Sequence, residues 1–321
     1  MYVRLKWVGA ALAAVFAGTP GAARAQTHAA AQLAAPAIGQ PTDSAAQAAA
    51  DSLAVVAGNY AALLPVPGQF RVCADPNALP YSNNAEQGFE NKLAQLLARD
   101  FQAHVVYTWY PQRRGFVRNT LRDYQCDVVM GVPSTLDMVL TTIPYYRSTY
   151  VFIYRKDRGL DIRSFDDPRL KTLKIGVYDF GNDYNNTPPV HALIDRGVPP
   201  DNFVGYSLYG DYARPNPPAD LIDAVARGEV DLAVGWGPIA GYFAQHEPVP
   251  LQIVPVSPAI DLPFRPYVYD MSLGVRRDDG KWLKEALDAV LTRHRAEIRQ
   301  LLVSYGIPLV ERPGSTSLTE K

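Results

Sequence analysis

Three arginines lie close together among aromatic residues in the segment WYPQRRGFVRNTL, residues 109–121. Arg113, Arg114 and Arg118 could bind an anionic ligand or an acidic partner surface, because the guanidinium group pairs well with carboxylates and is favoured in interfaces. The alternative is a solvated helix face, or ion pairs with aspartates in neighbouring loops. We expect Arg113 and Arg114 to lie near the mouth of a binding cleft and Arg118 to pack along a helix.

Tyrosines are concentrated in two other segments, PYYRSTY (144–150) and GYSLYGDYARPNPP (205–218). Large aromatic side chains bury much area on binding and lose little entropy. We therefore expect a group of aromatic residues to line the cleft: Tyr145, Tyr209, Tyr212 and Trp236. Ordinary core packing is the alternative, and it suits Tyr146 and Tyr150 better.

Two polar loops follow predicted strands and are further candidates for the cleft. The loop CADPNALPYSNN is rich in turn-forming residues and supplies four candidates: Asp75, Asn77, Tyr81 and Asn83. The loop YDFGNDYNN (178–186) supplies two more, Asn182 and Asp183. For Asp75 and Asn77, the alternative is that they only fix the backbone of their own loop.

Residues for catalysis or metal binding are not grouped in this sequence. Five histidines are scattered without a metal-binding spacing: His28, His104, His191, His246 and His294. No GxSxG, Walker A or GxGxxG motif is present. Glu86 and Glu90, four residues apart at a helix start, are expected to complement the helix dipole. The sequence favours a binding protein that is not an enzyme and has no metal or cofactor of its own.

The two cysteines allow one disulfide. Cys73 lies in the strand-like FRVCAD and Cys126 opens the strand-like CDVVMG. If these strands are parallel neighbours, a bridge between them is reasonable in an oxidising compartment. The alternative is two buried free thiols. Two distant cysteines exclude a CxxC redox pair and a thiolate metal site.

The N-terminus indicates export. Residues 1–25 combine a charged start (Arg4, Lys6), a short apolar run and the small-residue site Ala23–Ala25, which is typical of a signal peptide. Its removal takes three positive charges from a chain of net charge −1, which leaves −4 and argues against a nucleic-acid partner. No later apolar run is long enough to span a membrane. We expect a periplasmic protein.

The elements that would position these candidates alternate between strand and helix from residue 69 onward. Strands are expected in FRVCA, AHVVYTWY, CDVVMGV and LKIGVY, with FENKLAQLLARD as an amphipathic helix. Such alternation predicts right-handed crossovers and a mostly parallel sheet. One helix is expected within 43–64, and one long helix over 281–306.

An internal similarity indicates two α/β lobes. The segments Asp127–Gly131 and Asp231–Gly235 match in residue type, and each follows a helix and a tight break. The apolar strands in YYRSTYVFIYRKDRG and YVYDMSLGVRRDDG would connect the lobes. We expect a leader over 26–67, a first lobe over 68–153 and 266–312, a second lobe over 154–265 and a tail over 313–321, with the cleft between the lobes.

Six segments together carry a family resemblance: RVCADPNALPYSN, GFENKLAQLLARD, WYPQRRGFVRNTL, CDVVMGVP, MVLTTIPYYRSTYVFI and DLAVGWGPIAGYF. Over about residues 69–312 the chain resembles the type II periplasmic solute-binding proteins, in particular the MxaJ/XoxJ type associated with quinoprotein methanol dehydrogenase. The resemblance implies two α/β lobes joined by a two-strand hinge, and a monomer.

The resemblance also implies a partner. It implies a non-catalytic accessory of a methanol dehydrogenase that uses pyrroloquinoline quinone (PQQ), with that enzyme as partner and its c-type cytochrome as a second candidate. Amino-acid receptors of this fold hold the ligand with an arginine before the PYY segment and an aspartate in the second lobe. Here Ser134–Tyr146 contains no arginine and Trp236 occupies the aspartate position. The alternative function is an importer receptor for a small ligand that is not an amino acid.

Overall fold

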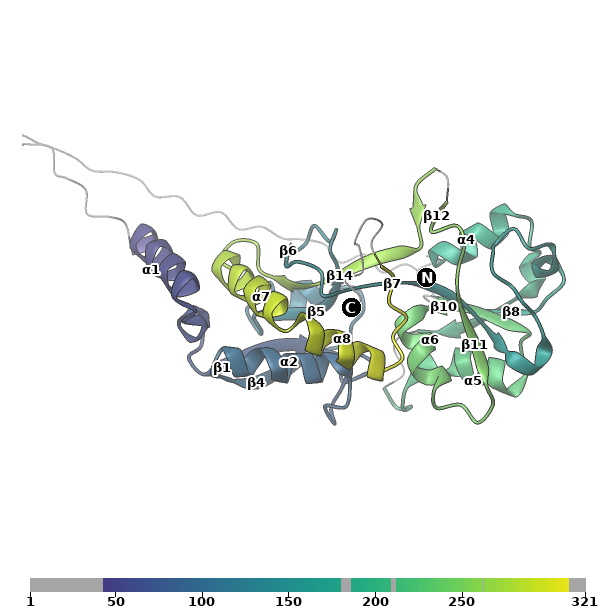
Figure 1. The fold of residues 1–321 in the computed structure, drawn as a ribbon, viewed down its shortest axis with the longest axis horizontal. Helices are drawn as coiled ribbons and strands as arrows, with labels where there is room; N and C mark the ends of the chain where they lie inside the picture. Colours follow the sequence, from purple (N-terminus) through teal and green to yellow (C-terminus); the bar gives the residue numbers. More distant parts are fainter. Residues whose placement is uncertain (1–42, 180–185, 209–211, 262, 312–321) are drawn as a thin grey trace, which may run out of the picture. The chain divides into compact units, whose positions relative to one another are not determined.

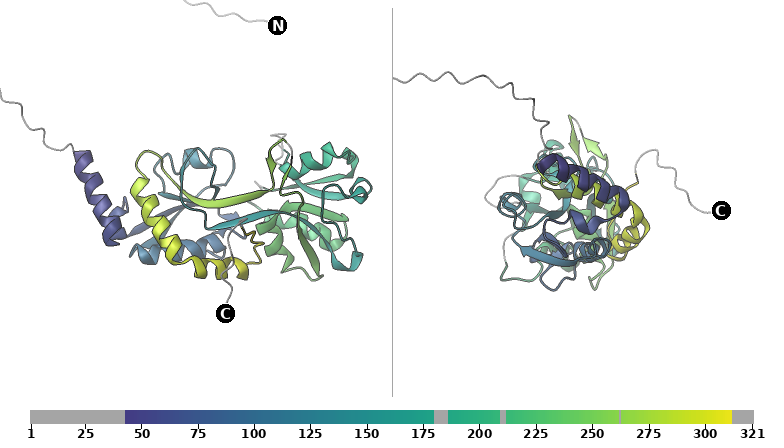
Figure 2. Two further views of the ribbon diagram at one scale, coloured as in Figure 1. Left: turned by 45° about the horizontal axis from the view of Figure 1, so that its top comes forward. Right: turned by 90° about the vertical axis from the view of Figure 1, so that its left-hand side faces the viewer.

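The computed structural model describes residues 43–179, 186–208, 212–261 and 263–311. The expected signal peptide, residues 26–42 of the expected leader and the expected tail lie outside these residues. Two of the longer strands, β7 (Tyr146–Arg155) and β14 (Val268–Val275), pair with each other in antiparallel fashion and run between two α/β lobes (Figure 1). In Figure 2 (left) they are the long teal and yellow-green strands.

The first lobe is built on three parallel strands in the order β4-β1-β5. They are β1 (Gln69–Ala74), β4 (His104–Trp109) and β5 (Val128–Pro133). Helices α2 (Phe89–Asp100), α7 (Lys281–Arg293) and α8 (Arg295–Ser304) lie beside these strands, and α3 (Phe116–Asn119) is a single turn (Figure 1). Short strands β2 (Asn77–Ala78), β3 (Ser82–Asn83) and β6 (Leu140–Thr141) complete this lobe.

The second lobe is built on parallel strands in the order β10-β8-β9. They are β8 (Ile175–Asp179), β9 (Phe203–Ser207) and β10 (Leu232–Trp236). Beside them lie α4 (Pro188–Asp195), α5 (Asp220–Arg227) and α6 (Gly237–Ala244) (Figure 1). Strand β11 (Leu251–Pro255) pairs with β7, and β12 (Ile260–Asp261) pairs with β13 (Arg265–Pro266). Short 3₁₀ helices complete the described chain: η1 (Tyr60–Leu63), η2 (Lys156–Arg158), η3 (Pro168–Lys171), η5 (Pro200–Asn202) and η6 (Pro217–Ala219).

The sheet differs from the expected mostly parallel one. The strands within each lobe are parallel, but β14 runs antiparallel to β5 and β7 runs antiparallel to β10. The reason is that β7 and β14 connect the lobes, so each must cross from one sheet half to the other. The sheet as a whole is therefore mixed.

The internal similarity corresponds to equivalent backbone positions. The backbone N–H of Asp127 donates to the carbonyl of Arg71 at 2.9 Å, and that of Asp231 donates to the carbonyl of Lys174 at the same distance. Each aspartate thus fixes the start of a strand, β5 or β10, against the first strand of its lobe. The two lobes repeat one strand–helix–strand plan.

Both long helices predicted near the ends of the chain are interrupted. Helix α1 (Asp43–Ala57) ends at Gly58, whose φ of +70° is the left-handed conformation typical of a residue after a helix C-terminus. The C-terminal helix is divided at His294 into α7 and α8. Both ring nitrogens of His294 contact carboxylates, Nε2 that of Asp100 at 2.5 Å and Nδ1 that of Glu297 at 3.0 Å. These contacts with α2 and α8 fix the break.

No helix among the described residues is both long and apolar enough to cross a membrane.

Candidate functional site

A cavity of about 310 Å³ lies where the carboxyl ends of parallel strands from both lobes meet the start of α2. Asp75 follows β1, Gly131 lies near the end of β5, and Trp236 is the last residue of β10. In parallel α/β sheets, this edge is where loops and helix N-termini converge on a ligand. The volume lies in the range of small-molecule sites.

Five of the predicted site residues line the cavity: Asp75, Asn77, Tyr81, Tyr212 and Trp236. Four others do not line it: Asn83, Arg113, Arg114 and Tyr145. The remaining three, Asn182, Asp183 and Tyr209, lie outside the described residues.

The four residues outside the lining have different surroundings. Asn83 fixes its own loop, since its side chain accepts from Gln87 N at 2.8 Å and donates to Gln87 Oε1 at 2.9 Å. Arg113 and Arg114 are exposed in the turn before α3. Tyr145 contacts the cavity-lining Glu90 through its hydroxyl. A role for these residues in binding stays a prediction.

Asp75 and Asn77 join the first lobe to the segment 212–216 of the second. Asp75 accepts hydrogen bonds from Asn77 N at 2.8 Å, Gln112 N at 2.6 Å and the Tyr212 hydroxyl at 2.8 Å. Asn77 Nδ2 donates to Arg214 O at 2.7 Å, and Asn77 Oδ1 accepts from Asn216 N at 3.1 Å. Asp75 therefore fixes its own loop and also bonds to Tyr212 of the second lobe, and its role in binding stays a prediction.

The cavity has an aromatic wall where β7, β10 and β14 meet. Tyr150 and Trp236 are register partners, and their rings lie 5.3 Å apart in an edge-to-face arrangement. Tyr269 completes the group at 5.7 Å from Trp236 and 6.4 Å from Tyr150. All three are only partly buried, so they offer aromatic surface to a ligand. Tyr150, expected in the core, is part of this wall.

Glu90, like Asp75, is a buried carboxyl group of the cavity. Its exposed fraction is 6%, and its Oε1 accepts a hydrogen bond from the Tyr145 hydroxyl at 3.3 Å. Burial raises the pKa of Glu90 to about 8, and the hydrogen bond from Tyr145 opposes that rise only in part. Its carboxyl lies against Gly131, where φ is +60° and any Cβ would overlap Glu90 Oε1. Glu90 is therefore mostly protonated, and so uncharged, at pH 7.

The contact between Glu90 and Gly131 was not predicted from the sequence. An acidic residue in the first turn of a helix usually faces solvent and complements the dipole. Only the close approach of β5 to α2 places this carboxyl in a cavity. The glycine of CDVVMG is the one local signal, since glycine permits a positive φ and a close contact.

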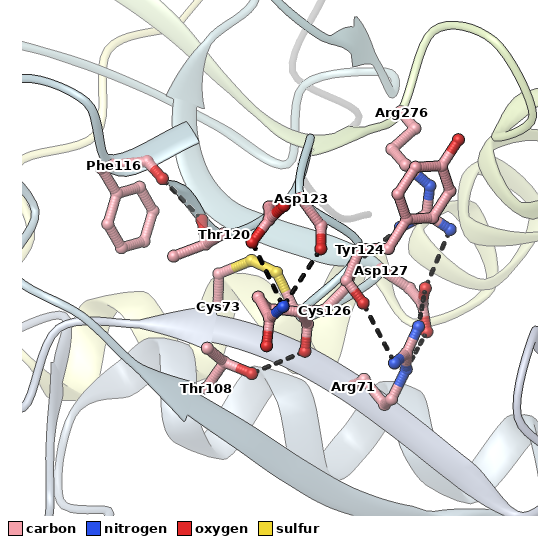
Figure 3. The surroundings of a disulfide bond; sticks show 11 residues. Arg71, Cys73, Thr108, Phe116, Thr120, Asp123, Tyr124, Cys126, Asp127 and Arg276 are labelled. Atoms are coloured by element: carbon pink, nitrogen blue, oxygen red, sulfur yellow. Dashed lines mark hydrogen bonds and ion pairs between the residues drawn. A yellow bond between two sulfur atoms is a disulfide. The ribbon is translucent and has the colours of Figure 1, made fainter. Parts of the chain in front are cut away.

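Cys73 and Cys126 form the predicted disulfide, with their Cα atoms 5.5 Å apart (Figure 3). It joins β1 to the residues before β5, two strands that are parallel neighbours. Beside it the buried Asp127 accepts from two arginines, Arg71 Nε at 2.8 Å and Arg276 Nη2 at 2.9 Å (Figure 3). The disulfide and this ion-pair network hold one edge of the first lobe together.

The cavity is suited to recognition. Among the described residues that line it, there are two carboxyl groups and no lysine, arginine or histidine. No group of three or more potential metal ligands occurs in the described part of the chain. What the residues provide is aromatic surface, hydrogen bonds and one neutral buried acid.

Comparison with known proteins places the chain in a family. Protein MoxJ of Methylorubrum extorquens is 34% identical over 256 residues, which cover 77% of this chain and 83% of that protein. The chain belongs to the MoxJ family. No family model matches. Residues of this MoxJ-family chain that line the cavity come from both lobes of the shared fold.

Two solved structures support the same assignment. The periplasmic binding protein XoxJ from Methylobacterium extorquens AM1 is 34% identical, with a TM-score of 0.62 over 76% of this chain and all of that one. MxaJ from Methlophaga aminisulfidivorans MPT is 30% identical, with a TM-score of 0.63 over 75% of this chain and all of that one. Amino-acid-binding proteins below 25% identity share the fold alone. This MoxJ-family chain therefore has the type II solute-binding fold.

Proposed function

We propose that this chain is a non-catalytic periplasmic accessory protein of a PQQ-dependent methanol dehydrogenase. Membership of the MoxJ family, the kinship with XoxJ and MxaJ, and the signal-peptide pattern of residues 1–25 support this proposal. In it, the cavity binds a segment of the dehydrogenase during maturation or activation of that enzyme.

The aromatic wall of Tyr150, Trp236 and Tyr269 is the observation that carries the proposal. A zwitterionic amino acid needs a cation for its carboxylate, and no basic residue is among the described residues of the lining. Aromatic surface suits a side chain of a protein segment, because such side chains anchor protein interfaces.

A small-ligand receptor for an importer is the second candidate. It is favoured by the cavity volume of about 310 Å³, which fits a compact small molecule. When such a receptor binds its small ligand, the two lobes should draw together around the ligand, whereas an accessory protein needs no such closure.

Affinity capture tests the proposal. The tagged mature protein would be incubated with periplasm from methanol-grown cells of its own bacterium, and captured proteins identified by mass spectrometry. A tagged, unrelated solute-binding protein is the control. We expect the dehydrogenase to be enriched over that control. Equal recovery from both baits would contradict the proposal.

A further inference from the structure

Glu90 is a buried acid for which the surrounding protein supplies little compensation. Its side chain is more than nine-tenths buried, yet it borders the cavity. Among the described residues, the hydroxyl of Tyr145 is its one side-chain hydrogen-bond donor, at the long distance of 3.3 Å. A buried carboxyl group normally has a cation or several donors as partners. A ligand in the cavity can supply the missing partner.

The groups around Glu90 do not supply positive charge. Tyr107, Tyr145 and Tyr146 interact electrostatically with Glu90, Tyr81 and Asp75 share the cavity lining with it, and Glu86 lies near Tyr107. Burial raises the pKa of Tyr107 to about 12 and those of Tyr145 and Tyr146 well above their usual value, so these phenols stay neutral. Asp75 already accepts three hydrogen bonds. Glu90 is thus the acid in this cavity still able to pair with a ligand.

The residues that line the cavity determine which ligand charge it favours. Aromatic faces carry negative potential and attract cations, and Tyr150, Trp236 and Tyr269 present such surface. Together with two carboxyl groups and no basic residue, they make the cavity unfavourable for an anion. We propose that the cavity binds a positively charged alkylammonium group, which pairs with the carboxylate of Glu90 while its apolar stem packs on the aromatic wall.

Binding then releases a proton. The neutral acid Glu90–COOH and the ligand R–NH₃⁺ give the ion pair Glu90–COO⁻ with R–NH₃⁺, and one H⁺ passes to solvent. Because the pKa of Glu90 in the empty cavity is about 8, release is nearly complete at pH 7 and vanishes above pH 9. The affinity should rise about tenfold for each unit by which the pH increases, up to about pH 8.

The inference rests on the proposed function only for the source of the ammonium group. That source is either a lysine side chain on the dehydrogenase or a free alkylamine. Both present the same chemistry to Glu90.

Calorimetry with n-pentylammonium as probe tests the inference, with n-pentanol as the neutral isostere. Titrations of the mature protein at pH 7 in phosphate and in MOPS, whose ionisation enthalpies differ and neither of which is a primary ammonium, give the number of protons released. We expect close to one proton for n-pentylammonium and at least tenfold weaker binding of that probe to Glu90→Gln. Glu285→Gln, which alters an acid outside the cavity lining, should leave the affinity unchanged.

The outcomes separate this inference from the proposed function. Tighter binding of n-pentanol than of n-pentylammonium, or no proton release by the wild type at pH 7, overturns the inference even if Glu90→Gln folds poorly. If the dehydrogenase binds wild type and Glu90→Gln equally, the proposed function stands and the lysine source is excluded. If n-pentylammonium binds as expected and the dehydrogenase does not, the inference stands with a free amine as the source.

Discussion

Glu90 makes the stability of this protein depend on pH. Its pKa is raised to about 8 in the folded state by burial, so folding favours the protonated form. The resulting stabilisation is fully present below the pKa of the unfolded chain, near 4.5, and is lost as the pH rises through about 8. The Glu90→Gln variant has no titratable group at this position, so its stability lacks this dependence on pH.

The difference in the free energy of unfolding between wild type and Glu90→Gln should change with pH. Relative to wild type, Glu90→Gln should gain on the order of 4 kcal/mol in the free energy of unfolding between pH 4.5 and pH 9. Urea unfolding at both pH values measures this, with Glu285→Gln as the control. A difference independent of pH would mean that the pKa of Glu90 is the same in the folded and the unfolded chain.

Gly131 and Gly159 form a matched pair of glycines for testing the contact between Gly131 and Glu90. Their φ angles are +60° and +64°, but a Cβ at Gly131 would overlap Glu90 whereas one at Gly159 meets open space. Gly159→Ala should cost only the backbone strain, about 1–2 kcal/mol. Gly131→Ala should cost roughly 1–3 kcal/mol more and displace Glu90. Equal losses in thermal or urea unfolding would contradict the contact.

At this scale the polar loop after β1 was predictable from the sequence, but the buried acid Glu90 was not. Asp75 and Asn77 were predicted because turn-forming residues after a strand tend to line clefts. Arg113 and Arg114 were predicted near the mouth; they are exposed in the turn before α3, next to Gln112 of the cavity lining, and their role in binding stays a prediction. Residue type does not reveal that β5 would bury Glu90.

The disulfide is the clearest stabilising feature at the scale of elements. It links β1 to the chain before β5 across a sequence separation of 53. Closing a loop of that length in the unfolded chain is worth about 4 kcal/mol. The variant Cys73→Ala/Cys126→Ala should lose a similar amount in urea unfolding, as should reduced wild type. A loss below about 1 kcal/mol in both would contradict this role.

Helices and strands were more predictable from the sequence than the residues at which they begin and end. Apolar periodicity and strand–helix alternation predicted β1, α2, β5, β8 and β10, because these patterns follow from burial of one face. The division of the C-terminal helix at His294 was missed, since it depends on contacts with Asp100 and Glu297. Tertiary contacts of that kind have no local signal.

At the scale of the whole molecule, Asn77 connects the lobes. It accepts from the backbone N–H of Asn216 at 3.1 Å and donates to Arg214 O. Asn77→Ala should therefore speed hydrogen exchange at the Asn216 amide by about tenfold or more, because the amide loses its acceptor. Asn83→Ala is the control, as Asn83 bonds within its own loop. Unchanged exchange in Asn77→Ala would show that the connection is absent in solution.

The two-lobe plan was predictable from the repeated Asp-strand-Gly segments, but the mixed sheet was not. Strand direction in β7 and β14 depends on how the chain crosses between lobes. Lobe boundaries at 153/154 and 265/266 remain predictions.

Binding of the mature protein to purified methanol dehydrogenase, measured by calorimetry for wild type, Trp236→Ala and Arg114→Ala, tests the central proposal most directly. Trp236 lies in the aromatic wall, whereas Arg114 is exposed outside the cavity lining. We expect Trp236→Ala to bind at least tenfold more weakly than wild type, and weaker binding of Arg114→Ala would extend the interface to the exposed turn before α3. Full affinity in Trp236→Ala would move the interface away from the cavity, and no binding by wild type would contradict the proposed function.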